Sequence, residues 1–423
     1  MINRMSGGIM QKTISVFVIV MLGLFSAVTA FGSIINANLY TEFNGYKVKL
    51  PQEESHIRSF QGMRLSVRDA FIPGLSVFVR GRIASDLSEK LSTDPDFRVF
   101  GAYLEYARKD LLTIKAGRQY VYAGIGGLTL DGGRVDYKLL KKLLITGYVG
   151  TTPGPSFYTY DEINTWKESN AYGGRVKYSG PHNVGIGISY QERRYKENLD
   201  SRVTGIDFAW SGRLIGTSLR ADYDNFQERL KLFAFRPNIK CPLGHSLNLE
   251  YLYRQPTLGL SNLFSTFASE PYHQFRINPT YKFSPKLYAF GTWAYTKFDD
   301  DNATRFSLGG SYRGQSLGMF FSDGYGGSQL GLFGSLSRNL NEKLRVYASG
   351  NMFDYKIDTN EDDTTPSLQA FFGCNYKLTG TLGTRAEMQI LSNNDYKYDT
   401  RYYVRVDYGI RFVQGDKEVG GGN

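Results

Sequence analysis

Arginines and lysines recur two residues apart in short segments of this sequence, a spacing that would let two side chains act together. Arg80 with Arg82 is one such pair, and Arg175 with Lys177 is another. Residues two apart on a strand point to the same face, so each pair would hold two positive charges side by side. Fixed positive charge in contact with water attracts anions and repels cations. This spacing therefore favours the electrostatic capture of anions.

The candidate residues for this role share one face of the segments that carry them. The candidate basic residues are Arg64, Arg68, Arg80, Arg82, Arg175, Lys177, Arg220, Arg276, Arg305, Arg345, Arg385 and Arg405. The acidic residues expected on the same face are Glu42, Glu105, Asp136, Asp207, Asp222, Glu250, Glu387 and Asp407. Either the excess positive charge acts on anions, or the arginines pair across strands with carboxylates and tyrosines and only stiffen the sheet. Both hypotheses are open at this point.

Spacings that would support catalysis or metal binding are weak. The four histidines lie far apart, and neither a Ser-His-Asp order nor a Cys/His spacing for zinc or haem can be built. No helix is predicted after the glycine-rich residues 124–127, which argues against a phosphate-binding loop. Oxygen atoms of Asp299, Asp300 and Asp301, or of the acidic residues 360–363, could bind calcium, but solvated loop tips have the same composition. No enzyme activity and no cofactor is expected.

The segment at residues 401–412 shows best how such residues are positioned. Apolar and aromatic side chains occupy one face at period two, and mostly polar ones occupy the other. The apolar face holds Tyr402, Val404, Val406, Tyr408, Ile410 and Phe412, and the opposite face holds Tyr403, Arg405, Asp407, Gly409 and Arg411. Aromatic residues at both ends of an apolar band are typical of a barrel strand that faces lipid.

Segments with this alternation follow one another along the chain. We predict an all-β fold, a transmembrane antiparallel up-and-down β-barrel of about 22 strands, with roughly 18–24 acceptable. The predicted strands lie around residues 35–43, 63–67 and 75–83 and then at 97–107, 111–120, 128–139, 143–150, 172–178, 184–190, 204–210, 215–223, 230–238, 246–253, 274–283, 287–297, 305–312, 317–323, 330–336, 344–353, 367–378, 382–390 and 401–412. Short and long connections alternate between them, as expected if one end of the barrel carries turns and the other carries loops.

The N-terminus carries a separate signal. Arg4 and Lys12 precede an apolar run that ends near Ala30, which predicts a secretory signal peptide over residues 1–30. The barrel is then expected over residues 31–412, followed by a C-terminal tail over 413–423. The formal net charge is +10, but no run of Lys and Arg is present. No nucleic-acid partner is expected from such dispersed charge.

The closing strand resembles the C-terminal assembly signal of bacterial outer-membrane barrels, with Tyr408, Gly409, Ile410 and Phe412 as the barrel-closing residues. The strand end at residues 117–119, Gly-Arg-Gln, is similar to strand ends common in porin-like families. The chain as a whole resembles bacterial outer-membrane porins and the larger export-type barrels. This resemblance implies a location in the outer membrane of a Gram-negative cell, where lipid, lipopolysaccharide and the barrel-assembly machinery are partners.

The function that these observations favour is a porin-like channel for passive diffusion of small hydrophilic, anionic solutes. Residue 31 leads almost directly into the first predicted strand, so no N-terminal plug domain is expected. A barrel of about 22 strands has a wide lumen. Either the long connections at residues 151–170 and 255–273 fold inward as a constriction, or a separate periplasmic protein fills the lumen. The alternative function is thus a sheath around a partner such as a multihaem cytochrome in an electron conduit. A surface enzyme or adhesin is a third hypothesis.

Overall fold

The computed structural model describes residues 34–48, 54–88, 94–140, 142–153, 163–256, 270–356, 364–394 and 398–413. The predicted signal peptide lies outside these residues, as do the acidic stretch 360–363 and the tail beyond Val413. Within the described ranges the chain forms 22 strands in one sheet. The prediction of an all-β barrel with this strand number is confirmed.

The strands are long enough to cross a membrane. The shortest have nine residues, and a tilted strand needs about 9–11 to span a bilayer. Their bounds are β1 (Ile34–Val48), β2 (Glu54–Arg68), β3 (Leu75–Asp86), β4 (Asp96–Arg108), β5 (Leu112–Tyr122), β6 (Gly127–Leu139), β7 (Leu143–Thr151), β8 (Ser169–Ser179), β9 (Val184–Tyr195), β10 (Asn198–Ser211), β11 (Ile215–Asp224), β12 (Arg229–Lys240), β13 (Ser246–Arg254), β14 (Tyr272–Ser284), β15 (Leu287–Lys297), β16 (Asn302–Tyr312), β17 (Gln315–Gly324), β18 (Ser328–Asn339), β19 (Leu344–Lys356), β20 (Thr365–Lys377), β21 (Leu382–Ser392) and β22 (Asp399–Val413). Two short 3-10 turns, η2 (Pro181–Asn183) and η3 (Pro242–Gly244), lie in connections.

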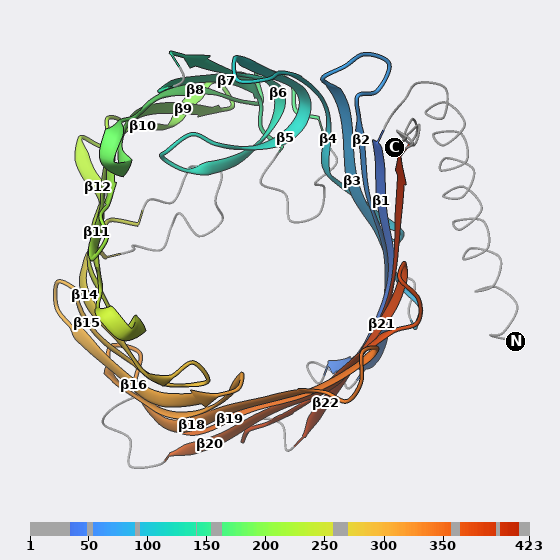
Figure 1. Ribbon diagram of the computed structural model, residues 1–423, viewed down its shortest axis with the longest axis vertical. Helices are drawn as coiled ribbons and strands as arrows, with labels where there is room; N and C mark the ends of the chain where they lie inside the picture. The colour runs from blue at the N-terminus through green and yellow to red at the C-terminus, as the bar shows by residue number, and fades with distance from the viewer. Residues whose placement is uncertain are drawn as a thin grey trace, which may run out of the picture.

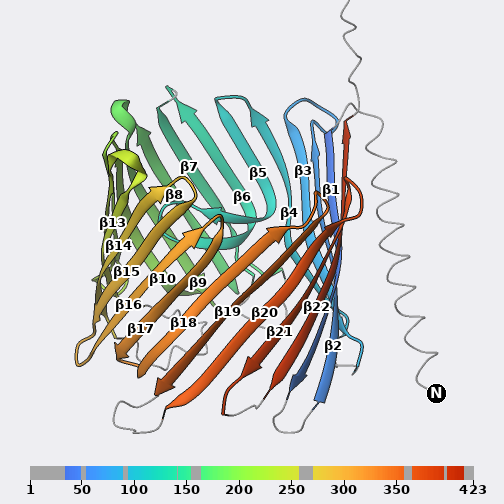
Figure 2. The same ribbon diagram turned by 60° about the horizontal axis from the view of Figure 1, so that its bottom comes forward.

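The sheet closes on itself. Each strand pairs antiparallel with the next, and β22 pairs with β1 through partners such as Ala37 with Ile410 and Leu39 with Tyr408. The strands form a ring around an open interior (Figure 1) and run tilted to its axis (Figure 2). The four residues predicted to close the barrel lie in this seam, and the backbone N–H of Gly409 donates to the carbonyl of Thr381 on the other side of β22, at 2.8 Å.

The exterior of the ring is apolar. Large apolar side chains are exposed on the outward face of strands all round the barrel, with Val404 46% and Leu332 52% exposed. Further examples are Leu104, Ile145, Ile188 and Leu308. A surface of this extent and character is stable against hydrocarbon rather than water. The alternate residues, which include the predicted charges, therefore face the interior.

The two ends of the barrel differ. Most connections at one end are tight turns, such as residues 69–74 and 313–314, where Gly74 and Gly314 have φ of +86° and +83°. The connections at the other end include the long ones between β7 and β8 and between β13 and β14. No helix within the described ranges is both long enough and apolar enough to cross a bilayer.

Candidate functional site

One hairpin leaves the wall and enters the interior. β4 pairs with β5 only up to Arg118, and β6 pairs with β7 only from Asp131 onward. β5 and β6 go on pairing with each other as far as Tyr122 and Gly127. Residues 119–130 therefore form a hairpin, named here the inner hairpin, that has no neighbouring strand on either side. Figure 1 shows it curving inside the ring of strands.

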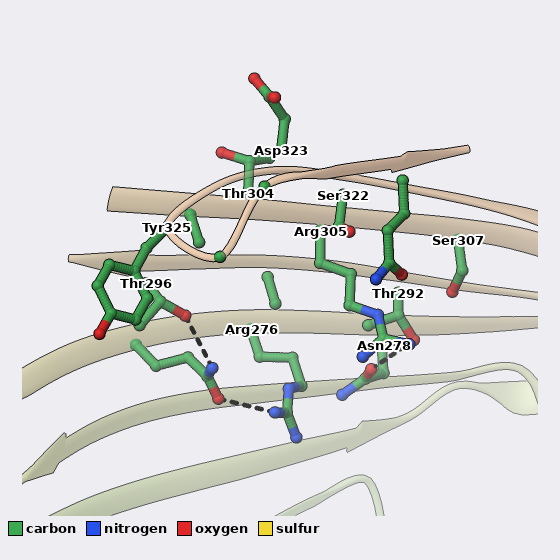
Figure 3. A pocket seen from close by; sticks show the side chains of 16 residues that line it. Arg276, Asn278, Thr292, Thr296, Thr304, Arg305, Ser307, Ser322, Asp323 and Tyr325 are labelled. Atoms are coloured by element: carbon green, nitrogen blue, oxygen red, sulfur yellow. Dashed lines mark hydrogen bonds between the residues drawn. The ribbon is translucent and has the colours of Figure 1, made fainter. Parts of the chain in front are cut away.

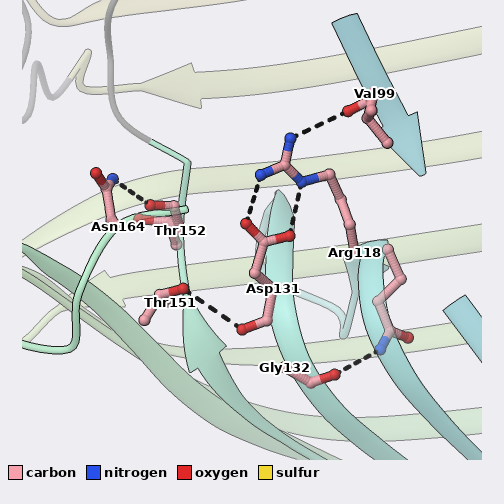
Figure 4. A network of polar contacts seen from close by, with 8 residues as sticks. Val99, Arg118, Asp131, Gly132, Thr151, Thr152 and Asn164 are labelled. Atoms are coloured by element: carbon pink, nitrogen blue, oxygen red, sulfur yellow. Dashed lines mark hydrogen bonds and ion pairs between the residues drawn. The ribbon is translucent and has the colours of Figure 1, made fainter. Parts of the chain in front are cut away.

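A buried ion pair holds the point where the inner hairpin leaves the wall (Figure 4). The Nε and Nη2 atoms of Arg118 each donate to a carboxylate oxygen of Asp131 at 2.7 Å, and Nη1 donates to the carbonyl of Val99 on β4 at 3.2 Å. The side-chain amide of Gln119 donates to the carbonyl of Gly132 at 3.3 Å. Bidentate pairs of this kind fix geometry as well as energy. The Gly-Arg-Gln segment thus serves as the branch point of the hairpin.

Glycine is required on both sides of the branch point. Gly117 has a φ of +122°, and a Cβ there would lie 2.3 Å from the carbonyl oxygen of Ala102. A Cβ on Gly132 would lie 2.2 Å from the carbonyl oxygen of Val149. Gly117 needs glycine for its left-handed φ, and both positions need it for the close backbone approach. These positions let the two strands bend away from the wall.

The inner hairpin packs on the inward face of β7 and β8. Its apolar side chains form a buried cluster with Tyr148 and Ala171 of the wall, and Leu130 is fully buried. The hairpin members of this cluster are Val121, Ala123, Leu128 and Leu130. The amide of Gln191 donates to the hydroxyl of Tyr148 at 3.0 Å beside the cluster. The hairpin is therefore seated by a small hydrophobic core inside the barrel.

The tip of the inner hairpin reaches β11, which is not its neighbour in the sheet. Nη1 of Arg220 donates to the Tyr122 hydroxyl at 3.1 Å, and Nη2 donates to the carbonyl of Ile125. Asp222, two residues along β11, accepts from Nε of Arg220 at 3.0 Å. The hairpin thus lines the interior from β6 to β11 and narrows the lumen. Of the predicted inward-folding connections at residues 151–170 and 255–273, residues 154–162 and 257–269 lie outside the described ranges.

Several of the predicted lumen arginines are neutralised by carboxylates. The ion pairs are Arg175–Asp207 at 2.7 Å, Arg220–Asp222 at 2.5 Å, Arg276–Glu250 at 3.6 Å, Arg385–Glu387 at 2.7 Å and Arg405–Asp407 at 2.6 Å, with Glu42 also 3.5 Å from Arg405. The contacts of these arginines fit the hypothesis that they pair with carboxylates and stiffen the sheet. They add little net charge to the lumen, except at Glu250, which Arg276 shares with Arg236.

The other predicted basic residues have no carboxylate partner in the described part of the chain. They are Arg64, Arg68, Arg80, Arg82, Lys177, Arg305 and Arg345, of which Arg345 donates to the Ser337 hydroxyl at 2.7 Å. On β2–β4 three of them lie over phenylalanine rings. Arg64 lies 5.5 Å from the centroid of Phe78, Arg80 5.5 Å from that of Phe100, and Arg82 5.6 Å from that of Phe100.

Sequence reasoning missed one further arginine of this group, Arg58 on β2. Arg58 lies 5.4 Å and Arg82 4.8 Å from the ring centroid of Phe60. The Nε atoms of both arginines are buried and have no hydrogen-bond partner within the described ranges. The N-terminal half of β2 continues the period-two pattern and could have predicted Arg58. Together we name this surface the arginine–phenylalanine patch, formed by Arg58, Arg64, Arg80, Arg82, Phe60, Phe78 and Phe100.

Among the predicted calcium ligands, Asp299, Asp300 and Asp301 are described, and they do not gather into a metal site. In the described ranges no group of three or more Asp, Glu, His or Cys side chains is placed to hold a metal. Asp301 instead completes the turn between β15 and β16, where its carbonyl accepts from the Phe298 N–H at 2.8 Å. Its carboxylate accepts from the Asn302 N–H at 2.7 Å. Asp299 and Asp300 are exposed on this turn, as expected for a solvated loop tip.

Neither a protein-family model nor a curated protein matches the sequence. Solved structures with a similar chain trace include the translocation pore of the P pilus usher PapC, at 8% identity and a TM-score of 0.46 over 90% of this chain and 100% of that chain. OpdQ of Pseudomonas aeruginosa has 12% identity and a TM-score of 0.46 over 90% and 99%. OccAB4 of Acinetobacter baumannii has 8% identity and a TM-score of 0.45 over 91% and 100%.

Proposed function

We propose that this porin-like barrel is an outer-membrane channel through which small hydrophilic anions diffuse. The closed sheet with an apolar exterior supports a location in a lipid bilayer, because closure leaves no unpaired strand edge in hydrocarbon. Barrels of this kind are found in bacterial outer membranes. The predicted partners, lipid, lipopolysaccharide and the barrel-assembly machinery, are part of the proposal.

The arginine–phenylalanine patch is the observation that carries the anion preference. Its four guanidinium groups have no carboxylate partner in the described residues, while most predicted arginines elsewhere are paired. Unpaired fixed charge on a channel wall raises the local concentration of anions. Phenylalanine rings hold the guanidinium groups through cation–π contact without neutralising them. The patch therefore keeps its positive charge available to solutes.

The inner hairpin gives the channel a narrower cross-section than the ring of strands alone. It covers the inward face between β6 and β11 and is fixed at its base by Arg118 and at its tip by Arg220. A narrower water-filled path brings solutes closer to the wall, where electrostatic attraction is less screened. Size filtering and charge preference then act on the same solute.

Reversal potentials of the purified protein in planar bilayers test this function. With a potassium chloride gradient across the bilayer, the expected sign is that of chloride permeating faster than potassium. The preference should shrink at high ionic strength, because the screening length falls from about 10 Å at 0.1 M to about 3 Å at 1 M. Cation selectivity at low salt would overturn the proposal.

A sheath around a separate lumen protein is the second candidate. The observation in its favour is the strand number, because aqueous porins have about 16–18 strands whereas 22-stranded barrels are commonly plugged. Conductance of the isolated protein distinguishes the two. A very large, unselective pore would favour the sheath, and a modest, anion-preferring pore would favour the channel.

A further inference from the structure

A polar cavity of about 600 Å³ lies on the lumen wall across β14–β18. Figure 3 shows its lining side chains, which come from five consecutive strands and the connection after β17. Small-molecule sites typically have volumes of about 300–1,000 Å³. The cavity is distinct from the arginine–phenylalanine patch and from the inner hairpin, and it shares no residue with either.

Positive charge in this cavity exceeds negative charge. The two arginines that line it are Arg276 and Arg305. Arg276 shares Glu250 with Arg236, so one carboxylate serves two guanidinium groups there. Arg305 has no carboxylate partner among the described residues. Asp323, the one carboxylate in the lining, points away from both arginines (Figure 3).

Neutral hydrogen-bonding groups surround the two arginines. Gln274 accepts from Nη2 of Arg276 at 2.7 Å and donates to the Thr296 hydroxyl at 2.9 Å. The Thr292 hydroxyl donates to the side-chain carbonyl of Asn278 at 2.9 Å. These contacts hold the amides in place and leave further donor and acceptor positions open, since each amide group can form several hydrogen bonds.

The cavity also has unused hydroxyl groups and an aromatic edge. Ser307 and Ser322 line it, and neither side chain makes a hydrogen bond within the described residues. Tyr325 is 59% exposed, and its ring lies 4.5 Å from that of Phe298. An exposed, supported ring offers an apolar face beside the polar groups.

We propose that this cavity binds hydroxylated carboxylates of the acidic-sugar class. The carboxylate pairs with Arg305, because a guanidinium binds a carboxylate through two parallel hydrogen bonds. The hydroxyl groups of the ligand bond to the amides and to Ser307 and Ser322, and its C–H face lies on Tyr325. The inference deepens the proposed function by naming a solute class, and it rests on that function for its physiological meaning.

Ligand-observed NMR titration of the detergent-solubilised protein tests the site without requiring conductance. The probes are galacturonate, which has both the carboxylate and the hydroxyls, galactose, which has only the hydroxyls, and acetate, which has only the carboxylate. We expect galacturonate to bind about tenfold more tightly than either galactose or acetate. Each of these two probes lacks one half of galacturonate and therefore the hydrogen bonds that this half makes.

The variant Arg305→Gln should weaken galacturonate binding about tenfold, as expected for loss of a charge-assisted pair. Arg345→Gln is the matched control, because it removes the same charge from the lumen wall outside the cavity and should leave binding within about twofold. Equal binding of galacturonate and acetate, or equal loss in both variants, would overturn the site. Those results would leave the chloride preference of the channel untouched. Conversely, a parent protein that binds galacturonate but does not prefer chloride over potassium would overturn only the channel function.

Discussion

Two regions of the lumen wall carry arginines at equivalent positions and use them differently. On β2–β4, Arg80 and Arg82 lie over Phe100 and have no carboxylate partner in the described residues. On β21 and β22, Arg385 and Arg405 are paired with Glu387 and Asp407. All four arginines sit on the inward face of a strand. The residue two positions further along the same strand decides whether the charge of the arginine is neutralised.

This difference can be followed in the local sequence. Arg385 and Arg405 belong to Arg-x-Glu and Arg-x-Asp triplets, and Arg220 with Asp222 is a further case. Arg80 and Arg82 form an Arg-x-Arg triplet instead. Because residues two apart share a face, a triplet ending in a carboxylate neutralises itself. A triplet of two arginines cannot, and it depends on aromatic rings for support.

The largest effect that separates the two regions is expected on ion selectivity. The triple variant Arg64→Gln, Arg80→Gln and Arg82→Gln removes three of the four unpaired charges of the patch and leaves Arg58. We expect the reversal potential in a salt gradient to fall close to the value for a non-selective pore, because the attraction for anions has lost its main source. Planar-bilayer recording at low ionic strength measures it.

The control for this variant removes a pair rather than a charge. Arg385→Gln with Glu387→Gln leaves the net charge of the lumen unchanged and should preserve the reversal potential of the parent protein. A loss of selectivity equal to that of the triple variant would show that the paired region also contributes to the field, and the distinction between the two regions would be wrong.

A second effect is expected from removal of the inner hairpin. Arg118 and Asp131 are direct partners in the β5–β6 register, so an Asn-Gly turn can join them in place of residues 119–130. We expect conductance to rise, because the lumen widens. Anion preference should fall at the same time, because ions then pass farther from the patch and along the paired arginines of β8–β11. Unchanged conductance would show that the hairpin does not narrow the path.

A disulfide provides the matched control for the hairpin variant. A Cβ on Gly205 would lie 2.9 Å from Cγ1 of Ile125, the atom that the sulfur of Ile125→Cys replaces, and 2.8 Å from Oδ1 of Asp222, which must shift to admit it. A Cβ and the sulfur across a disulfide are about 3 Å apart. Ile125→Cys with Gly205→Cys, in a protein whose Cys241 and Cys374 are serine, should tether the tip to β10. Conductance should be the same in oxidised and reduced protein if the hairpin is already seated on the wall.

The sequence predicted the strands better than it predicted the hairpin. Every predicted strand overlaps one of the 22 observed, because lipid on one side and water on the other impose the same alternation on each. The inner hairpin breaks this rule visibly. Val121, Leu128 and Leu130 are apolar. They lie on the same face of β5 and β6 as Lys115 and Arg134, which face the lumen. That change of character was a signal that these positions face protein.

The pairing of the arginines was only partly predictable. The carboxylates of β11, β21 and β22 could be read from residues two apart. The Arg175–Asp207 pair, at 2.7 Å, joins β8 to β10 across β9. It depends on the absence of a side chain at Gly187 on β9, which lies between the two residues. Such a contact requires the register of three strands, which no local pattern supplies.

The smallest expected effect is on stability. In Arg385→Gln, Glu387 loses one charged donor but keeps hydrogen bonds from Tyr347 and Gln389, at 2.7 and 2.8 Å. We expect a loss of about 1 kcal/mol, since a mostly buried carboxylate is left less well satisfied. In Arg80→Gln, the lost cation–π contact of about 0.5–1 kcal/mol is offset by weaker repulsion from Arg82.

The temperature at which each variant loses its compact form in gel electrophoresis measures this difference. Arg385→Gln should unfold at a lower temperature than the parent protein, and Arg80→Gln should unfold close to it. If Arg80→Gln were the less stable of the two, the patch would be a structural support rather than a surface for solutes. The ranking matters because a charge that does not stabilise the barrel is free to act on solutes, which is the role proposed for the patch.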